Sequence, residues 1–433
     1  MSEDILKKRY VLVGSGSRCS MYVKAILGAY SEFASLVGIC DVNKTRMRYI
    51  ANKAKAEFGG EEIPLYGAED FDKMVREQKA DVVIVTTIDR QHHTYIIRAM
   101  ELGCDAVTEK PMTMDVEKCK AILETVDRTG RSLRVTFNYR YSPARTQVKD
   151  LLMQGVIGQV KAINFEWLLD TVHGADYFRR WHRDKRNSGG LMVHKATHHF
   201  DLVNWWLDSS PETVFGLGDL KFYGRENAEN RGQTAFYDRG TGHPNAKDDP
   251  FALNLEKEPE LKAMYLDAEH EDGYLRDQSV FGDGINIEDT MNLVVRYKSG
   301  TQMSYTLSAF CPWEGYKINF IGDKGRIELE DLEKSYVSAA SGELGESLSH
   351  SQKLLVMPHW EKAYEVEVPK AVGGHGGGDD PMLESIFSPH AVADAYGRTA
   401  NHVDGARSIL TGLAANQSFA TGLPVQVDDL ISL

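Results

Sequence analysis

The sequence contains few cysteines, no long apolar run and no excess of positive charge. Its five cysteines are odd in number, scattered and without a Cys-x-x-Cys pair, which disfavours a disulfide framework or a zinc–cysteine site and indicates reduced thiols. No stretch approaches the roughly 18 consecutive apolar residues of a membrane-spanning helix. The start, MSEDILKKRYVLVGSG, lacks the apolar core of a signal peptide. We therefore expect a cytoplasmic protein with no membrane partner.

The charge balance is acidic, because 50 basic and 63 acidic residues give a formal net charge of −13. This balance argues against nucleic acid or another polyphosphate as a partner and is neutral about small uncharged molecules. A chain of 433 residues is too long for one average domain and fits two.

The first third of the chain alternates short apolar runs with helical patterns, which is typical of a doubly wound parallel sheet of the Rossmann type. The expected strands are 10–16, 36–41, 81–87, 105–111 and 133–139. The expected helices are 17–30, 43–58, 92–102 and 115–129. We predict a first domain over residues 1–138.

The pattern then changes to runs in which apolar and polar residues alternate, as in an antiparallel sheet with one face available. These runs are 158–169, 291–300, 301–310, 316–330 and 364–369, and YKSGT and GDKGR are the expected turns. We predict a second α/β domain over 139–433 with an insertion around 221–285, a lid or a dimer arm. A large open sheet face is unfavourable alone, so we expect a homo-oligomer, a dimer or a tetramer.

The glycine-rich run VLVGSGSRC lies where the first strand turns into a helix, so that its backbone N–H groups can bind a pyrophosphate. Cys19 stands at the third glycine position of the usual fingerprint. Asp41 ends the second strand, where an acid binds ribose hydroxyls and favours NAD over NADP, although Arg46 nearby leaves room for a 2′-phosphate. The candidate cofactor residues here are Gly14, Gly16, Ser17, Arg18, Asp41 and Arg46.

Lys110, in TEKPM, directly follows an apolar strand. A lysine at the carboxyl end of a parallel strand points into the crevice where such sheets bind ligands. Desolvation and a positively charged nicotinamide would both lower its pKa and make it a usable proton donor or acceptor. A surface lysine before a helix is the alternative.

Four stretches together resemble the glucose–fructose oxidoreductase/inositol dehydrogenase family (Gfo/Idh/MocA), in order along nearly the whole chain. They are VLVGSGSR, VTTIDRQHHTYIIRAMELGCDAVTEKPM, NYRYSPA and GGLMVHKATHHFDLVNWWL. The resemblance implies an N-terminal Rossmann domain that binds NAD, and a C-terminal α/β domain with a large open, mainly antiparallel sheet. It also implies an active site between the nicotinamide and that sheet.

The resemblance implies roles for single residues as well. Lys110 matches the catalytic lysine of the family. The loop after the fourth strand and the residue before the lysine match positions on the cofactor side, here Thr87, Asp89, His92 and Glu109. The family's aspartate and, four residues on, histidine correspond to His194 and His198, so this chain departs from the pattern at residue 194.

His194 and His198 are expected one turn apart on one helix, on the ridge opposite an apolar stripe. The leading interpretation is proton transfer, in which His198 takes a proton from a sugar hydroxyl. Two structural histidines are a second interpretation. A zinc pair is a third, although no His-Glu-x-x-His motif is present, and we predict no metal.

Other residues are candidates for the substrate side. Aromatic and cationic side chains before the histidine helix suit sugar faces, although a solvated basic loop is the alternative. His375 lies in GGHGGGDDP, interpreted as a loop over the substrate rather than a linker. PWEGY lies at a strand end facing the same sheet and could contribute Trp313 or Glu314. Tyr139, Arg140 and Tyr141 lie at the domain junction, where they could meet sugar hydroxyls, although a structural hinge is equally expected. The substrate candidates are Tyr141, Trp181, His182, Arg183, His194 and His375.

The resulting prediction is an NAD-dependent oxidoreductase that oxidises a secondary hydroxyl of a sugar, glycoside or cyclitol. The first alternative is a glycoside hydrolase that keeps NAD bound and uses transient oxidation and elimination, with His194 as a second base. A non-catalytic ligand sensor and a metal-dependent enzyme are further alternatives.

Overall fold

The computed structural model describes residues 7–336, 346–348, 351–371 and 374–433. By packing, the chain divides into two compact units. Unit 1 comprises Met1–Asn138, Leu255–Leu275 and Asp379–Ala406, and unit 2 comprises Tyr139–Asn254, Arg276–Gly378 and Arg407–Leu433. The predicted division at 138/139 differs from this packing at two later segments, which join unit 1. Sequence periodicity reports local structure, so it carried no signal of this long-range packing.

Unit 1 is built on a parallel sheet with the strand order β16-β6-β5-β4-β1-β2-β3. Its strands are Lys8–Val13 (β1), Ala34–Asp41 (β2), Leu65–Gly67 (β3), Val82–Val85 (β4), Asp105–Thr108 (β5), Leu133–Val135 (β6) and Ala400–Asn401 (β16). Only β16 among these described strands pairs antiparallel. The strand order reverses between β1 and β4, and ligands of such sheets bind beyond the carboxyl ends at that point.

The helices of unit 1 follow the expected βαβ pattern. They are Cys19–Leu27 (α1), Lys44–Phe58 (α2), Phe71–Glu77 (α3), His92–Glu101 (α4), Val116–Thr129 (α5), Pro259–Leu261 (α12), Glu269–Asp272 (α13) and Asp379–Phe387 (α15). Two helices begin with a side-chain cap, because Asn43 accepts from the Arg46 amide and Asp115 from the Lys118 amide.

Unit 2 is built on a large, mainly antiparallel sheet with the order β15-β14-β12-β11-β7-β10-β9-β8-β17, and β13 pairs with β12. The strands are Val160–Asp170 (β7), Pro211–Asp219 (β8), Thr290–Tyr297 (β9), Gln302–Cys311 (β10), Trp313–Gly322 (β11), Gly325–Tyr336 (β12), Glu346–Leu348 (β13), Ser351–Pro358 (β14), Tyr364–Val366 (β15) and Val425–Gln426 (β17). Strands β7 and β10 pair in parallel. The predicted fold class is therefore confirmed.

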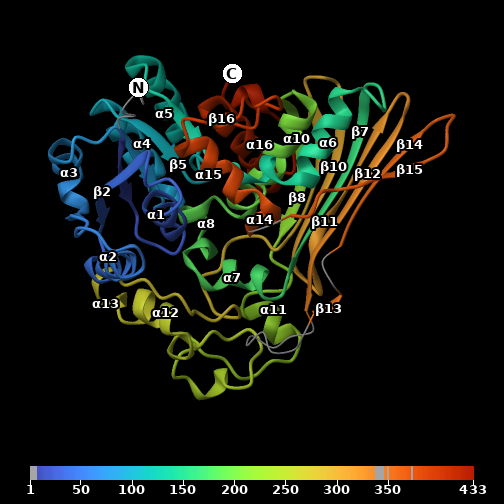
Figure 1. Ribbon diagram of the computed structural model, residues 1–433. Coiled ribbons are helices and arrows are strands. Elements are labelled where there is room, and N and C mark those ends of the chain that lie inside the picture. Colours follow the sequence, from blue (N-terminus) through green and yellow to red (C-terminus); the bar gives the residue numbers. More distant parts are fainter. Residues whose placement is uncertain (1–6, 337–345, 349–350, 372–373) are drawn as a thin grey trace, which may run out of the picture. The chain divides into compact units, whose positions relative to one another are not determined.

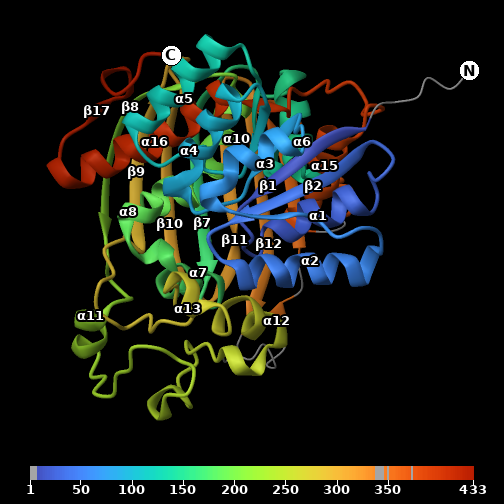
Figure 2. The same cartoon turned by 90° about the vertical axis from the view of Figure 1, so that its left-hand side faces the viewer.

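Helices α6, α10 and α16 lie along one face of this sheet (Figures 1 and 2). The helices of unit 2 are Pro143–Met153 (α6), His173–Arg179 (α7), Lys185–Ser188 (α8), Leu191–His194 (α9), Thr197–Leu207 (α10), Arg225–Asn230 (α11), Gly374–Gly377 (α14) and, from Arg407 on, His402–Thr421 (α16). On strand β9, buried and exposed residues alternate, because one face packs on the helices. Within the described residues, no helix is long and apolar enough to cross a membrane.

The expectation of one helix carrying both histidines is wrong. His194 ends α9, and His198 lies in the first turn of α10. Between them the Ala196 amide donates to the Leu191 carbonyl, five residues back, in a wide turn that interrupts the i,i+4 ridge. The expectation of an open side opposite an apolar stripe also fails, because every residue from Leu191 to Trp206 is buried.

Candidate active site

The glycine-rich loop after β1 has the backbone geometry that a dinucleotide site needs. Gly14 has φ of 96°, and a Cβ there would lie 2.6 Å from backbone atoms of Thr86 and Thr87, so only glycine fits. At Gly16 no described atom lies within 4 Å of the position a Cβ would take. Helix α1 begins three residues later at Cys19, so the loop presents backbone N–H groups at a helix start, as phosphate binding requires.

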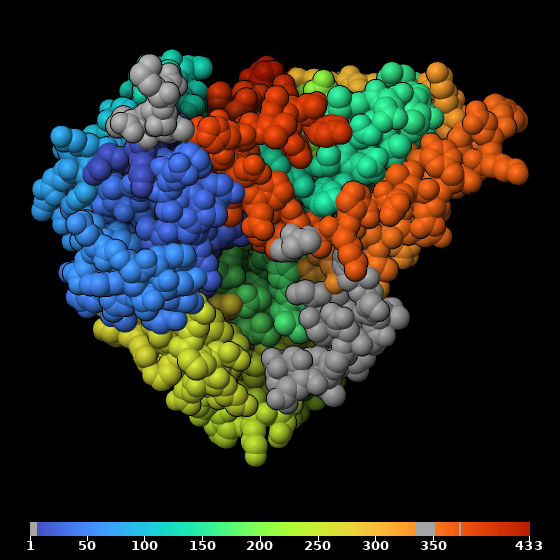
Figure 3. All heavy atoms as spheres, in the orientation of Figure 1, coloured from blue at the N-terminus to red at the C-terminus, as the bar shows by residue number. Residues whose placement is uncertain are grey.

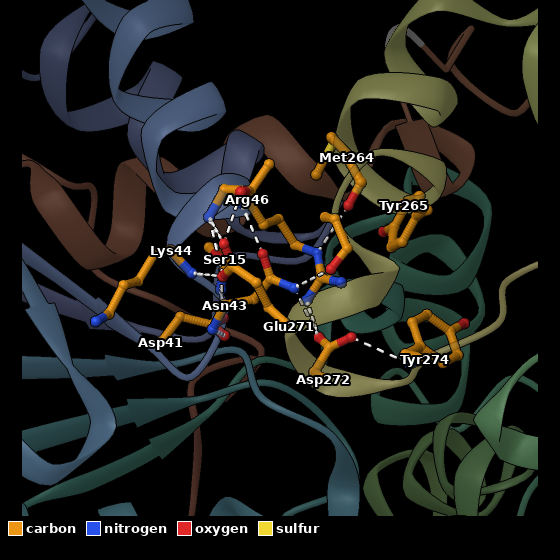
Figure 4. A network of polar contacts seen from close by, with 12 residues as sticks. Ser15, Asp41, Asn43, Lys44, Arg46, Met264, Tyr265, Glu271, Asp272 and Tyr274 are labelled. Atoms are coloured by element: carbon orange, nitrogen blue, oxygen red, sulfur yellow. Dashed lines mark hydrogen bonds and ion pairs between the residues drawn. The ribbon is translucent and has the colours of Figure 1, made fainter.

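Asp41, the last residue of β2, is held beside this loop. Its Oδ2 accepts from the backbone amide and, at 2.8 Å, from the hydroxyl of Ser15, and its Oδ1 accepts from the Asn43 amide at 2.8 Å (Figure 4). A carboxylate offers about four acceptor positions, so one remains for a ribose hydroxyl. The residues present therefore fit an NAD ribose.

Arg18 and Glu109, both predicted on the cofactor side, contact each other. Arg18 Nε donates to Glu109 Oε1 at 2.6 Å, and the Tyr22 hydroxyl donates to the same oxygen at 2.7 Å. Burial alone would raise the pKa of Glu109, but the Arg18 charge and these two hydrogen bonds hold that pKa below its usual value. The pair thus stays ionised and links α1 to the carboxyl end of β5.

Thr87, Asp89 and Lys110 follow strands β4 and β5, and His92 is the first residue of helix α4. The His92 ring is buried and lies between two backbone carbonyls, Pro111 at 2.8 Å from Nδ1 and Thr87 at 3.1 Å from Nε2. Burial lowers the pKa of His92. His92 therefore connects the segments that follow β4 and β5. Lys110 is half-buried, and Asp89 is buried, with 2% exposed.

Arg46 is bound by residues from the second half of the chain. Its Nε donates to the Met264 carbonyl at 3.0 Å, and its Nη1 lies 3.1 Å from Asp272 Oδ2. Ser17, another predicted cofactor residue, bonds to the Tyr265 hydroxyl through its amide at 3.1 Å and its own hydroxyl at 2.6 Å. No motif or spacing in the sequence indicated Met264, Tyr265 or Asp272.

In unit 2, a buried group of proton-carrying and cationic side chains surrounds Tyr139. Lys195 Nζ donates to the Tyr139 hydroxyl at 3.0 Å. The Tyr139 ring stacks on the His198 ring with centroids 4.0 Å apart, and the Arg145 guanidinium lies 4.1 Å from the Tyr139 centroid. All four residues are buried, so their electrostatic interactions are strong.

His194 belongs to a different aromatic group of unit 2. Its ring centroid lies 4.2 Å from that of His182, 5.6 Å from Tyr177 and 5.7 Å from Trp181. Burial raises the pKa of Tyr177. Its hydroxyl lies 2.9 Å from His173 Nε2.

The far side of His173 contacts Glu314, since His173 Nδ1 lies 2.6 Å from Glu314 Oε1. Glu314 is 3% exposed, so its carboxylate, His173 and the Tyr177 hydroxyl form a hydrogen-bonded chain. Such a chain can orient a tautomer and pass a proton. Among the described residues, no three His, Cys, Asp or Glu side chains form a group that could hold a metal.

The remaining predicted substrate residues lie in three different surroundings within unit 2. Trp181 stacks on His182 at 3.6 Å, within the His194 group. Arg183 instead donates to the carbonyls of Ser279 and Asp283, and burial lowers its pKa to about 10, so it holds a loop. Exposed His375 lies 6.0 Å from the Tyr139 ring.

Tyr141 is buried, with 5% exposed. Gly373, the first residue of the predicted substrate loop, lies outside the described residues. Lys195, His173 and Tyr177 were not selected from the sequence, because a lone lysine, histidine or tyrosine carries no spacing signal, and only the fold brings them together.

Family models match both parts of the chain. The model described as "Oxidoreductase family, NAD-binding Rossmann fold" matches residues 8–137, and "Oxidoreductase family, C-terminal alpha/beta domain" matches residues 149–427. The chain belongs to the Gfo/Idh/MocA oxidoreductase family. The predicted family and the predicted NAD cofactor are thereby confirmed, and the first domain is an NAD-binding domain.

The relatives of this family member are oxidoreductases and a hydrolase. YteT of Bacillus subtilis (strain 168), named an oxidoreductase, is 33% identical over 98% of this chain and 99% of its own length. Glycosyl hydrolase family 109 protein 1 of Akkermansia muciniphila is 27% identical over 43% of this chain and 40% of its own. The inositol 2-dehydrogenase of Rhizobium meliloti (strain 1021) is 27% identical over 48% and 57%.

A solved structure shares the fold of the whole chain. The WlbA dehydrogenase from Bordetella pertussis, in complex with NADH and UDP-GlcNAcA, has a TM-score of 0.62 and 18% sequence identity. The match covers 97% of this chain and 99% of that one. At this identity the likeness concerns the fold alone.

Proposed function

We propose that this family member is an NAD-dependent dehydrogenase that oxidises a secondary hydroxyl of a sugar, glycoside or cyclitol. The observation that carries the proposal is the buried group of Lys195, Tyr139 and His198 in unit 2. Removing hydride from an alcohol carbon requires that the hydroxyl lose its proton, and this group contains three side chains able to handle one.

NAD, when bound, supplies the acceptor for the hydride. His198 is the proposed acceptor of the hydroxyl proton, as predicted, and Lys110 is the proposed second proton-handling residue. Tyr139 is a further proposed residue, supported by the hydrogen bond of its hydroxyl to the Lys195 ammonium at 3.0 Å. The ammonium holds the phenol oxygen in place through a charge-assisted hydrogen bond. The division of labour among these residues is part of the proposal.

The carbohydrate class rests on two kinds of support. Relatives of the chain are named for inositol oxidation and glycoside hydrolysis. The rings of Trp181, His182 and Tyr177 around His194 form an aromatic group of the kind that packs on the apolar faces of sugars.

A glycosidase that uses NAD transiently is the second candidate. Oxidation of one ring carbon acidifies the neighbouring C–H, so elimination of the aglycone requires a second base. His194, beside the Glu314–His173–Tyr177 chain, would be that base in the group separate from His198. A partial relative is named a glycosyl hydrolase.

One assay separates the two candidates. Purified protein is incubated with NAD and a panel of sugars, cyclitols and aryl glycosides, while absorbance at 340 nm and released aglycone are followed together. NADH without cleavage is the expected result, and cleavage without net NADH would favour the glycosidase. His198→Asn should abolish turnover, whereas His359→Asn, at an exposed position after β14, should not. If neither NADH nor free aglycone is formed with any compound of the panel, both candidates are contradicted.

Three further proposals accompany this function. We place the protein in the cytoplasm, because its cysteines occur without a disulfide among the described residues. We also propose that it is a homo-oligomer, and that residues 139–433 supply both the substrate side and the subunit contacts.

A further inference from the structure

Residues 255–275, here called the clasp, fold with unit 1 although they lie far along the chain. Figure 3 shows them in yellow at the surface, directly against the blue residues of that unit. The clasp contacts the start of α2, immediately after Asp41, and it contacts Ser17 in the glycine-rich loop. It therefore touches both sequence elements that bind NAD.

The contacts with α2 are specific and partly buried (Figure 4). Glu271 accepts from the amides of Lys44 and Thr45 and, at 2.7 Å, from the Thr45 hydroxyl. Asn43 Nδ2 donates to the Ala268 carbonyl at 2.8 Å and to Asp272 at 3.0 Å. The clasp thus replaces solvent at the first turn of α2.

Arg46 is the central residue of this interface. Its side chain is 8% exposed, and that of Asp272 is 15% exposed. Two of its guanidinium nitrogens are engaged by Met264 and Asp272, and the Tyr265 ring lies 5.2 Å away. The third nitrogen, Nη2, is buried without a hydrogen-bond partner among the described residues.

This arrangement matters for the choice of dinucleotide. Asp41 is the acid that binds ribose hydroxyls, and an arginine nearby is what accommodates the 2′-phosphate of NADP. Arg46 is the buried cation at that place, but Asp272 already neutralises it. The carboxylates of Asp41, Glu271 and Asp272 outnumber the cations Arg46 and Lys44, so a group carrying about −1.5 to −2 charges is repelled.

We propose that Asp272, through its ion pair with Arg46, is a specificity-determining residue that excludes dinucleotides with a 2′-phosphate. The inference rests on the cofactor site of the proposed function and needs no substrate. The clasp thereby turns a residue that would favour NADP into part of an NAD site.

Calorimetric titration of the purified protein with NAD and with NADP, at fixed ionic strength and without sugar, tests the proposal. The wild type should bind NAD at least about 10-fold more tightly than NADP. Asp272→Asn should tighten NADP binding about 5-fold or more and leave NAD within about 2-fold, because Arg46 becomes available to a phosphate. The added substitution Arg46→Gln should remove that gain.

A matched control lies in the same segment. Glu260 of the clasp pairs with Lys53 of α2 at 2.8 Å, but its side chain is 52% exposed, so Glu260→Gln should leave both affinities unchanged. Parallel weakening of both dinucleotides in Asp272→Asn would overturn the proposal. If that variant does not fold, as judged by its melting curve, the wild-type ratio decides, since equal affinities contradict the proposal.

The outcomes separate this inference from the proposed function. If the wild type binds NAD more tightly than NADP but oxidises no sugar, the proposed role of Asp272 is supported and the proposed dehydrogenase function is contradicted. If the protein is an active dehydrogenase but binds NAD and NADP equally, the dehydrogenase function is supported and the role of Asp272 is contradicted.

Discussion

At the scale of single residues, Tyr139 has a ring that packs and a hydroxyl that could take part in the reaction, and a substitution can separate these two roles. Its ring packs on His198 and under Arg145, while its hydroxyl accepts a hydrogen bond from Lys195. Tyr139→Phe keeps the ring and removes the hydroxyl. We expect kcat to fall about 100-fold or more, whereas the free energy of unfolding should change by only about 1 kcal/mol. Steady-state kinetics and thermal melts measure the two quantities.

The control for this variant is Tyr364→Phe, because Tyr364 is 45% exposed on the edge strand β15. It should leave kcat unchanged. A loss of kcat in Tyr139→Phe that equals its loss of folded protein would assign the residue to packing alone.

The positions and conformations of single residues were predictable from the sequence where the backbone determines them. Gly14 needs a positive φ beside Thr86, and Asp41 ends a strand, and both requirements follow from the local pattern. Arg183 shows the limit, because its guanidinium binds carbonyls of a loop about a hundred residues away. No local sequence pattern distinguishes an arginine that binds loop carbonyls from one that contacts a sugar.

At the scale of elements, α7 carries both His173 and Tyr177 and is anchored through Asp176. Burial would raise the pKa of Asp176, but Arg276, Arg180 and Arg179 together hold it well below the usual carboxyl value. The strongest contact is with Arg276 Nη1, at 2.6 Å. The carboxylate is 23% exposed, so its partners compete only partly with water.

Asp176→Asn removes this charge and should lower the free energy of unfolding by about 2 kcal/mol, below the roughly 3–5 kcal/mol of a fully buried pair. The folded-state pKa is depressed, so the stabilisation is complete above the unfolded pKa of about 4 and is lost as pH falls further. Urea unfolding at pH 7 and pH 3 should therefore show a smaller difference between variant and wild type at pH 3. An equal difference at both pH values would contradict the ion-pair explanation.

Helices and strands were predictable where the apolar–polar periodicity continues over many residues. The turns at 297–301 and 322–326 connect β9 to β10 and β11 to β12 as expected. The break between α9 and α10 was not predictable, because Lys195 and Ala196 are good helix formers, and tertiary packing overrides their propensity. The clasp was not predictable either, since its short helices carry weak periodicity and its partners are more than 200 positions away.

At the scale of the whole molecule, the outer face of the unit 2 sheet bears on the proposed homo-oligomer. Phe215 on β8 lies opposite Val294 on β9, and these side chains are 38% and 56% exposed. Leu217, on the same face of β8, is 64% exposed. Neighbouring positions are polar, since Thr306 donates to Asn292 at 2.8 Å, so the face is mixed rather than fully apolar. Neighbouring exposed apolar side chains with a polar rim are the kind of patch that marks protein–protein contacts.

Leu217→Lys places a charge on that face without entering the core. We expect light scattering after gel filtration to show a dimer or tetramer for the wild type and a smaller mass for the variant, because desolvating an unpaired ammonium in an interface is costly. Leu423→Lys is the matched control, since Leu423 is 62% exposed but lies outside the sheet, and its mass should equal that of the wild type. A wild type that is monomeric at micromolar concentration would remove the oligomer proposal. A variant that keeps the wild-type mass would move the interface to another face, because the lysine would then remain in water.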